Sequence, residues 1–265
     1  MIIVPKSVTS INRQVYRMHH TASFFFHGPL QDFLSRSKKG SWQSYAFTGL
    51  PAVKDAIEAQ GVPHPEVNVL LVNGAPVPLL HPLAACDWVE VYPAGSSYNL
   101  PESWSLRASR PPTTAFVLDV HLGKLARALR LLGFDTCYEN DYSDQAIAQL
   151  ASEQNRIVLT RDVGLLKQKN ITWGYWLRSQ HLQEQLTEVI SYFNLAPAFR
   201  PFARCLACNG LIEQVAKERI ADQLPPKTKL YFEEFFQCSS CQQVYWKGSH
   251  YAHMQAFISR LARPL

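Results

Sequence analysis

Residues 113–162 constrain the fold most, because short apolar runs alternate there with helical patterns. Two apolar runs, 116–119 and 157–162, each end in an aspartate, and a helical stripe over 122–132 follows the first of them. A short strand is expected at 134–138, and a second helix follows it. Strands that alternate with helices of this length form a parallel sheet with right-handed crossovers. The sequence therefore predicts an α/β domain.

Three aspartates mark one rim of this predicted sheet. Asp119 and Asp162 end the two strands, and Asp144 begins the second helix after a Ser143 cap. In parallel sheets, ligands bind beyond the carboxyl ends of the strands. Three carboxylates repel one another there unless protons or a cation neutralise them, and all-oxygen ligation suits Mg²⁺ or Mn²⁺. Such a metal activates water against a phosphodiester, so these acids are candidate catalytic residues. Asp141, in the same loop, is an alternative to Asp144.

Two other interpretations of these acids stay open. An aspartate after a strand is often only a turn residue or a helix cap. A phosphoacceptor receiver domain also gathers acids at strand ends. It requires a further lysine at a strand end and more strands than residues 171–177 offer.

Four of the six cysteines form two C-x-x-C pairs, Cys205 with Cys208 and Cys238 with Cys241. Each such turn directs two thiolates at one point, as tetrahedral Zn²⁺ requires. Disulfides are disfavoured in a reducing cytoplasm, and a redox site needs one pair that opens a helix. Four cysteines also leave no open position for catalysis. We therefore predict a structural zinc site.

The residues around the second cysteine pair carry further signals. Between the pairs, a helix is expected at 211–224 and a strand at 229–236. Beyond the second pair, basic and aromatic side chains are interleaved, a pattern that can stack single-stranded bases and contact phosphates. Trp246, Lys247 and His250 are therefore candidate RNA contacts. The aromatic residues here could instead attach this region to the α/β domain.

Residues 21–95 form a separate unit. Strands are expected at 22–26, 42–47 and 87–93, a helix at 51–61, and a hairpin at 67–77 around an Asn-Gly turn. This order is similar to the β-grasp of ubiquitin-like proteins. Sulfur carriers of that group need a free terminal Gly-Gly, whereas this chain continues, so a module that docks RNA or a partner is expected. Residues 96–113 are predicted to be a linker, and 1–20 an extension.

The charge distribution fits a partner that carries phosphates. Net charge is +5, and from residue 200 onward nine Lys and Arg face five Asp and Glu, against eight and nine over 114–199. A basic region beside an acidic site is the balance expected of a nuclease. The start lacks a secretory signal pattern, and no apolar run reaches the ~18 residues of a membrane span. A cytoplasmic protein is therefore expected.

Four motifs carry a resemblance to a known family. They are FVLD at 116–119, LGKLAR at 122–127, LRLLGFDT at 129–136 and LTRD at 159–162. In this order they resemble the Mut-seven C-terminal RNase-domain family, and the match extends to about Met254. The resemblance implies a PIN-like nuclease domain (114–200) followed by a zinc ribbon (201–265), with a ubiquitin-like domain in front. It also implies that Asp119, Asp144 and Asp162 take the places of the family's metal-binding acids.

The sequence therefore predicts a three-part, metal-dependent ribonuclease. Asp119, Asp144 and Asp162 would hold Mg²⁺ or Mn²⁺, and Lys124, Arg127 and Arg161 are candidates for contacts with substrate phosphate. Two alternatives remain: a non-catalytic RNA-binding protein whose acids are caps, and an adaptor that acts through the β-grasp surface. Because the acids and zinc ligands all lie beyond the linker, the β-grasp unit is expected to be separable from the chemistry.

Overall fold

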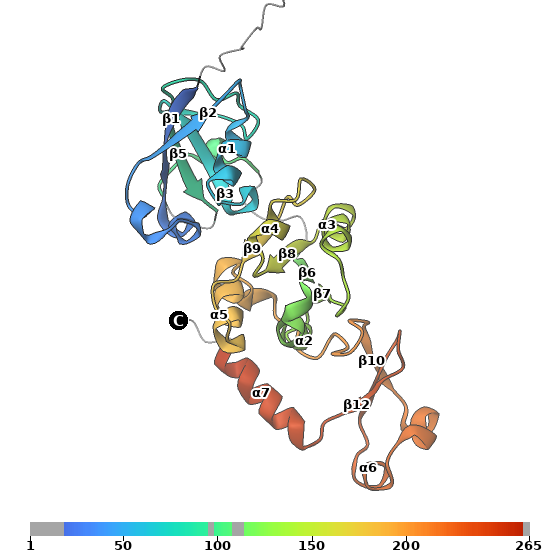
Figure 1. Cartoon of the computed structure of the whole chain (residues 1–265). Helices are drawn as coiled ribbons and strands as arrows, with labels where there is room; N and C mark the ends of the chain where they lie inside the picture. Colours follow the sequence, from blue (N-terminus) through green and yellow to red (C-terminus); the bar gives the residue numbers. More distant parts are fainter. Residues whose placement is uncertain (1–18, 95–97, 108–113, 262–265) are drawn as a thin grey trace, which may run out of the picture.

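A computed structural model describes residues 19–94, 98–107 and 114–261 of the 265-residue chain. The predicted extension (1–20) lies outside this range except for its last two residues, as do parts of the predicted linker. Figure 1 shows three successive parts, a mixed sheet, a parallel sheet and a small ribbon. Among the described helices, none is both long enough and apolar enough to cross a membrane.

The first part is the predicted β-grasp. Its sheet has the order β2-β1-β5-β3-β4, with β1 antiparallel to β2 and parallel to β5. The turn at Asn73 and Gly74 has positive φ at both residues, 53° and 81°, as the Asn-Gly signal predicts. The elements are β1 (His20–Phe26), β2 (Gln43–Phe47), α1 (Val53–Ala59), β3 (Val67–Val72), β4 (Ala75–Pro76) and β5 (Trp88–Pro93), with short 3-10 helices at Gly28–Phe33, Arg36–Lys38, His64–Glu66 and Glu102–Trp104.

The second part is a parallel four-stranded sheet of order β7-β6-β8-β9 with helices on both faces. Phe116 and Leu118 of the first strand share a core with α2 and α5, while Val117 shares the opposite core with α3 and α4. The predicted α/β domain is confirmed. Its elements are β6 (Ala115–Leu118), α2 (Gly123–Leu131), β7 (Asp135–Cys137), α3 (Asp144–Glu153), β8 (Ile157–Thr160), α4 (Val163–Leu166), β9 (Gly174–Trp176) and α5 (Leu182–Tyr192), with 3-10 helices at Val120–Leu122 (η5) and Ala196–Ala198.

The third part is an antiparallel ribbon of order β10-β11-β12. The helix predicted at 211–224 is wrong, because Ile212 pairs with Cys238 in a ladder and only a 3-10 helix follows. The strand predicted at 229–236 is also wrong, since Pro226 opens a helix and the strand begins later. The elements are β10 (Ile212–Val215), η7 (Lys217–Gln223), α6 (Pro226–Tyr231), β11 (Phe235–Cys238), β12 (Val244–Trp246) and α7 (Ser249–Leu261).

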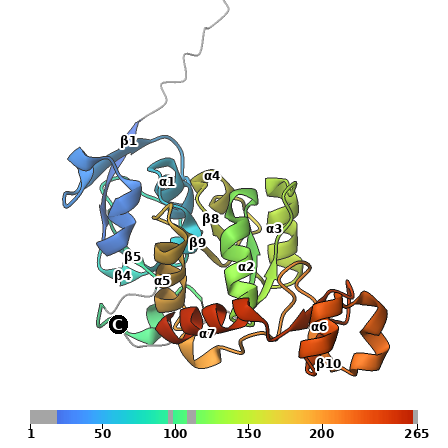
Figure 2. The ribbon, with the colours of Figure 1, turned by 90° about the horizontal axis from the view of Figure 1, so that it is seen from below.

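The last helix, α7, returns from the ribbon to the α/β domain. Figure 2 shows it crossing beneath α2 and α5. Ile258 is buried in their core, and Met254 and Phe257 pack against that core. The basic and aromatic stretch predicted to lie on the ribbon therefore begins on β12 and ends on a helix anchored to the α/β domain.

Arg130 joins the ribbon to the α/β domain. Although it lies off the apolar stripe of α2, its side chain is buried and donates hydrogen bonds to the carbonyls of Thr136 (3.0 Å) and Ala207 (2.8 Å). Asn209 accepts from the Thr136 N–H (2.9 Å) and donates to Asp135 (2.8 Å). The turn that carries the first cysteine pair is thus held against β7.

The β-grasp docks on the β9 edge of the parallel sheet through polar groups. Glu66 is 1% exposed and accepts from the backbone N–H of Trp176 (2.6 Å), and Arg178 donates to it at 3.5 Å. His64 lies 2.8 Å from the carbonyl of Ile171, across the same interface. Burial raises the pKa of Glu66, against the opposing effect of Arg178. A chain that begins at residue 114 would expose this interface, so we expect it to be less stable than the full chain.

We predict that Arg178→Ala destabilises the chain by about 3 kcal/mol, because a buried carboxylate loses its cation. A carboxyl with a raised pKa contributes stability below its unfolded pKa and loses it as the pH rises through the folded pKa. The decrease in the free energy of unfolding caused by Arg178→Ala should therefore be larger at pH 7 than near pH 4, where Glu66 is more protonated. Thermal unfolding at both pH values measures this, with the exposed Arg36→Ala as control. An equal loss at both pH values would contradict it.

Candidate active site and metal centre

Two of the predicted acids lie at the ends of neighbouring strands and are linked by a threonine. Asp119 follows β6 and is 7% exposed. Its Oδ2 accepts a hydrogen bond from the Thr160 hydroxyl at 2.7 Å. The same hydroxyl oxygen accepts from the N–H of Asp162 at 2.8 Å. Thr160, the last residue of β8, therefore connects the two strand ends.

Both acids also cap helices. Asp119 Oδ1 accepts from the N–H of His121 (3.0 Å) at the start of η5. Asp162, which is exposed, accepts from the N–H of Gly164 (2.6 Å) at the start of α4. Capping, the alternative that the sequence left open, is thus one role that both side chains perform. A carboxylate has about four lone-pair positions, so one or two such bonds leave capacity for a cation.

The third predicted acid forms no metal-holding group with this pair among the described residues. Asp144 is exposed at the first position of α3, where Ser143 caps the helix by accepting from Ala146 N–H (3.2 Å). Asp141 is exposed in the preceding loop. Over the described ranges, the four paired cysteines are the only group of three or more His, Cys, Asp or Glu that could hold a metal. The structure thus links Asp119 to Asp162 but does not bring Asp144 or Asp141 into a ligand cluster with them.

A cleft of about 920 Å³ opens over η5 and the first turns of α2, the segment that directly follows Asp119. Asp119 and Asp162 are not among its lining residues. Lys124 and Arg127, the predicted phosphate contacts, line it, together with His121 and His181. Arg161 is exposed at the end of β8 and lies outside this lining. Cationic side chains therefore line the segment that follows the buried acid.

The four paired cysteines converge at one point of the ribbon. Their Sγ atoms all lie within 4.8 Å of one another. Cys205 is 3.6 Å from Cys241, and Cys208 is 3.4 Å from Cys238. Four thiols at this separation fit tetrahedral Zn²⁺ and leave no open position. The predicted four-cysteine site is therefore present.

The surroundings favour the thiolate form at Cys205, whereas burial and the neighbouring sulfurs raise the pKa of Cys241. The Tyr245 hydroxyl lies 3.1 Å from Cys205 Sγ, and the N–H of Cys208 donates to the same sulfur (3.5 Å). Burial opposes ionisation of Cys205, but these hydrogen bonds outweigh it and lower its pKa to about 6. A metal ligand must be deprotonated, so this arrangement prepares the sulfur for a cation.

Comparison with known families agrees with this architecture. The Mut7-C RNAse domain matches residues 114–258, more than half of the 265-residue chain. The chain belongs to the Mut7-C RNAse domain family. The Mut7-C ubiquitin domain matches residues 19–99, which contain the β-grasp. Comparison with curated proteins gave no match, and neither did comparison with solved structures. The resemblance drawn from the sequence is confirmed.

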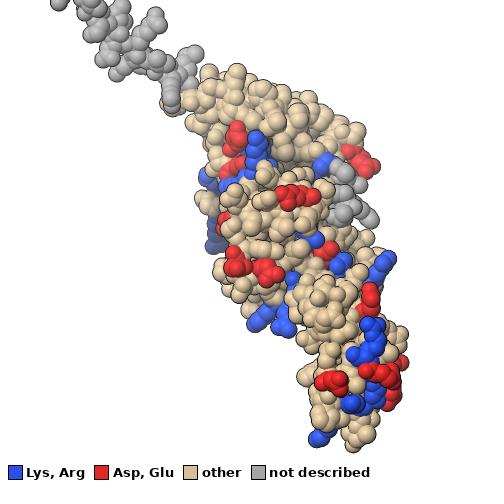
Figure 3. All heavy atoms as spheres, turned by 90° about the vertical axis from the view of Figure 1, so that its right-hand side faces the viewer, with Lys and Arg blue, Asp and Glu red and all other residues tan. Residues whose placement is uncertain are grey.

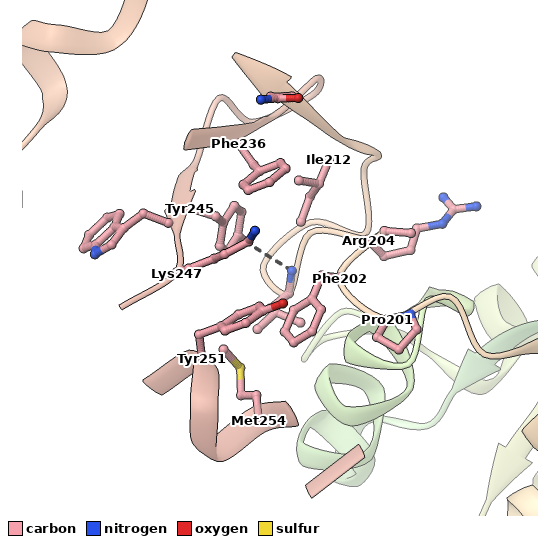
Figure 4. A pocket seen from close by; sticks show the side chains of 13 residues that line it. Pro201, Phe202, Arg204, Ile212, Phe236, Tyr245, Lys247, Tyr251 and Met254 are labelled. Atoms are coloured by element: carbon pink, nitrogen blue, oxygen red, sulfur yellow. Dashed lines mark hydrogen bonds between the residues drawn. The ribbon is translucent and has the colours of Figure 1, made fainter. Parts of the chain in front are cut away.

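The predicted RNA contacts of the Mut7-C ribbon do not all lie together. Trp246 and Lys247 line an apolar cavity of about 360 Å³ (Figure 4), whereas His250 is exposed outside its lining. Lys247 forms an ion pair with Glu234, which raises the pKa of Lys247. On the face shown in Figure 3, basic and acidic side chains are interspersed over the ribbon. The surplus positive charge of this region is therefore partly paired.

Three residues that position the site were not singled out from the sequence. They are Thr160, Arg130 and Asn209. Thr160 stands inside the LTRD motif, so its place at a strand end was a usable signal. Arg130 and Asn209 act through contacts with residues distant in sequence, and no local pattern reports such contacts.

Proposed function

We propose that the Mut7-C domain is a metal-dependent ribonuclease that hydrolyses phosphodiester bonds of RNA. One observation carries the proposal: Asp119 and Asp162 end neighbouring parallel strands and are joined by Thr160, and the segment that directly follows Asp119 lines a cleft with the cations Lys124 and Arg127. Ligands of parallel sheets bind at this rim. Membership in the family supports a nuclease-type function.

The proposed roles follow from position and charge. Asp119 and Asp162, with Asp144 or Asp141 as the third acid, would hold Mg²⁺ or Mn²⁺, since carboxylate oxygens are the ligands that these ions prefer. When bound, such an ion polarises the phosphodiester and lowers the pKa of attacking water. Thr160 orients the Asp119 carboxylate through its hydroxyl.

The basic residues and the zinc would serve substrate binding. Lys124 and Arg127, together with Arg161, would neutralise phosphates at the rim. Zn²⁺ on the four cysteines would hold the ribbon so that Trp246, Lys247 and His250 can reach single-stranded RNA. We place the protein in the cytoplasm, where reducing conditions keep four thiols available to the metal.

We also propose that the β-grasp docks a protein partner. Trp42 and Trp88 are 43% and 58% exposed, and their ring centroids lie 5.1 Å apart on the β-grasp. Exposed aromatic side chains are enriched at protein interfaces. This surface lies on the part of the chain that carries neither the three candidate catalytic acids nor the four paired cysteines.

The cleft cations give a quantitative prediction. Lys124→Ala and Arg127→Ala should each weaken binding of single-stranded RNA to a similar extent for all base sequences. Each should also make the negative slope of log affinity against log salt shallower by about 0.7, because one phosphate contact is lost. Filter binding at several salt concentrations measures both. The exposed Lys169→Ala, outside the cleft, is the control, and an unchanged slope in both cleft variants would contradict these contacts.

A non-catalytic RNA-binding protein is the second candidate, because both strand-end acids act as caps and the described residues include no metal-holding group of acids. Incubating labelled single-stranded RNA with the full chain and Mg²⁺ or Mn²⁺ separates the candidates. Cleavage supports the ribonuclease, and binding without cleavage supports the second candidate. Neither binding nor cleavage would favour an adaptor that acts through the β-grasp.

A further inference from the structure

The cavity between the ribbon and α7 is lined by apolar side chains from two sides. Figure 4 shows Tyr251 and Met254 rising from α7, with Phe236 and Tyr245 facing them from the ribbon. Phe202 lies between the two sides. These side chains are only half-buried, so the cavity keeps apolar surface in contact with solvent.

One wall of the cavity has an unusual backbone. Phe202 has a φ of 65°, a conformation that is an outlier for a bulky side chain. Its N–H donates to the carbonyl of Leu131 (3.1 Å), and its ring lies 4.7 Å from that of Tyr251, tilted by 33°. The surrounding fold therefore holds two aromatic rings together in the wall of the cavity, against a local conformational cost.

The cavity and the cationic cleft share one lining residue. Leu206 lines both hollows, and its carbonyl accepts a hydrogen bond from Arg130 at 3.3 Å. Arg204 and Lys247 are the charged residues in the cavity lining. Arg204 is paired with Asp135 (3.4 Å), and Lys247 lies 6.0 Å from the Phe236 ring. The cleft is thus lined by several cations, whereas the cavity is lined mainly by aromatic and other apolar side chains.

We infer that this cavity binds an unpaired nucleobase of the RNA strand whose backbone occupies the cleft. The inference rests on the proposed function and extends it. The cavity volume of about 360 Å³ lies in the range of ~300–1,000 Å³ typical of small-ligand pockets. Aromatic rings stack on any base, and the shared wall at Leu206 allows one strand to occupy both hollows. The cations of the cleft on the other side of Leu206 favour a nucleic-acid strand over a protein side chain as the occupant.

Binding of a base in this cavity determines the class of RNA substrate. A base can enter the cavity only when it is not paired, so the preferred substrate is single-stranded RNA or an unpaired nucleotide in a folded RNA. A continuous duplex should bind through the cleft alone, and therefore more weakly. The zinc site acts here as a positioning element, because Tyr245 of the cavity wall contacts Cys205.

The test compares three variants of the full, zinc-loaded chain by fluorescence anisotropy with a labelled ten-nucleotide RNA, in buffer without added divalent cation. Tyr251→Ala should bind about tenfold more weakly than wild type, as expected for loss of one stacked base. Tyr251→Phe, which keeps the ring, should bind like wild type. Tyr231→Ala removes an aromatic side chain that is 73% exposed on α6, outside the cavity, and should also bind like wild type. Zinc content shows that each variant retains its ribbon.

A second arm identifies the occupant. A series of RNAs carries one abasic position, placed at a different nucleotide in each. We expect wild type to bind one of them about tenfold more weakly than the intact RNA. Tyr251→Ala should bind that RNA and the intact RNA equally well, because the stacked base is already lost. Unchanged affinity of Tyr251→Ala, or equal abasic losses in both proteins, overturns the inference and leaves the cavity to a protein side chain. Binding through Tyr251 without cleavage in Mg²⁺ or Mn²⁺ would contradict the proposed function alone. Cleavage with unaltered binding would contradict this inference alone.

Discussion

The Asp119→Asn protein is expected to cleave RNA about a thousandfold more slowly than wild type. Asparagine keeps the size of the side chain but removes one negative charge from the proposed cation site, so the transition-state charge is no longer stabilised. Asparagine also has one acceptor oxygen, whereas Asp119 accepts from both His121 and Thr160. We therefore expect a loss of about 1 kcal/mol in the free energy of unfolding as well.

The two effects are separated by measuring cleavage and melting temperature on the same samples. Asp222→Asn, an exposed acid on η7 of the ribbon, is the matched control for loss of one charge. Comparing Asp144→Asn with Asp141→Asn identifies the third acid, since only a metal ligand should lower activity strongly. An active Asp119→Asn protein with a lowered melting temperature would show that the acid is only a cap.

Cys208→Ala is expected to abolish zinc binding and to unfold the ribbon. Structural zinc contributes roughly 10–16 kcal/mol of binding free energy in small zinc domains, and three thiolates cannot replace a closed four-sulfur site. The parallel sheet should persist, because α7 is anchored in its core by Ile258 rather than by the metal. Elemental analysis and circular dichroism measure the two outcomes.

Cys137→Ser is the matched control, because this half-buried cysteine lies on β7, outside the four-sulfur group. It should retain about one zinc per chain. Zinc retained by Cys208→Ala, or wild-type protein purified without chelator that contains none, would contradict the assignment. Loss of the parallel sheet together with the zinc would contradict the separate anchoring of α7.

The predictions of the parallel sheet from sequence succeeded where local pattern and burial agree. Residues 116–118 are apolar on both faces because both faces of β6 are covered, and the Ser143 signal marked the start of α3. The two cysteine pairs were readable because a C-x-x-C turn brings two sulfurs together whatever the rest of the fold does. The Asn-Gly turn of the β-grasp is equally local.

The errors in the ribbon, and the buried polar residues that the sequence did not reveal, have a common cause in contacts between distant residues. Ile212 lies in a strand because Cys238 supplies a pairing partner, although its neighbours fit a helix. Arg130 is buried because the carbonyl groups of Leu206 and Ala207 surround it. Glu66 is buried because a second domain covers it. None of these partners is visible in a local window.

The most direct test of the ribonuclease proposal is the cleavage rate of end-labelled single-stranded RNA as Mn²⁺ or Mg²⁺ is added to the zinc-loaded full chain. Asp162→Asn, purified in the same way, serves as the reference for contaminating nucleases. We predict no cleavage without the added ion, a rate that rises and saturates with it, and almost none in Asp162→Asn. Cleavage that is independent of the ion, or equal in the wild type and Asp162→Asn, would contradict the proposal.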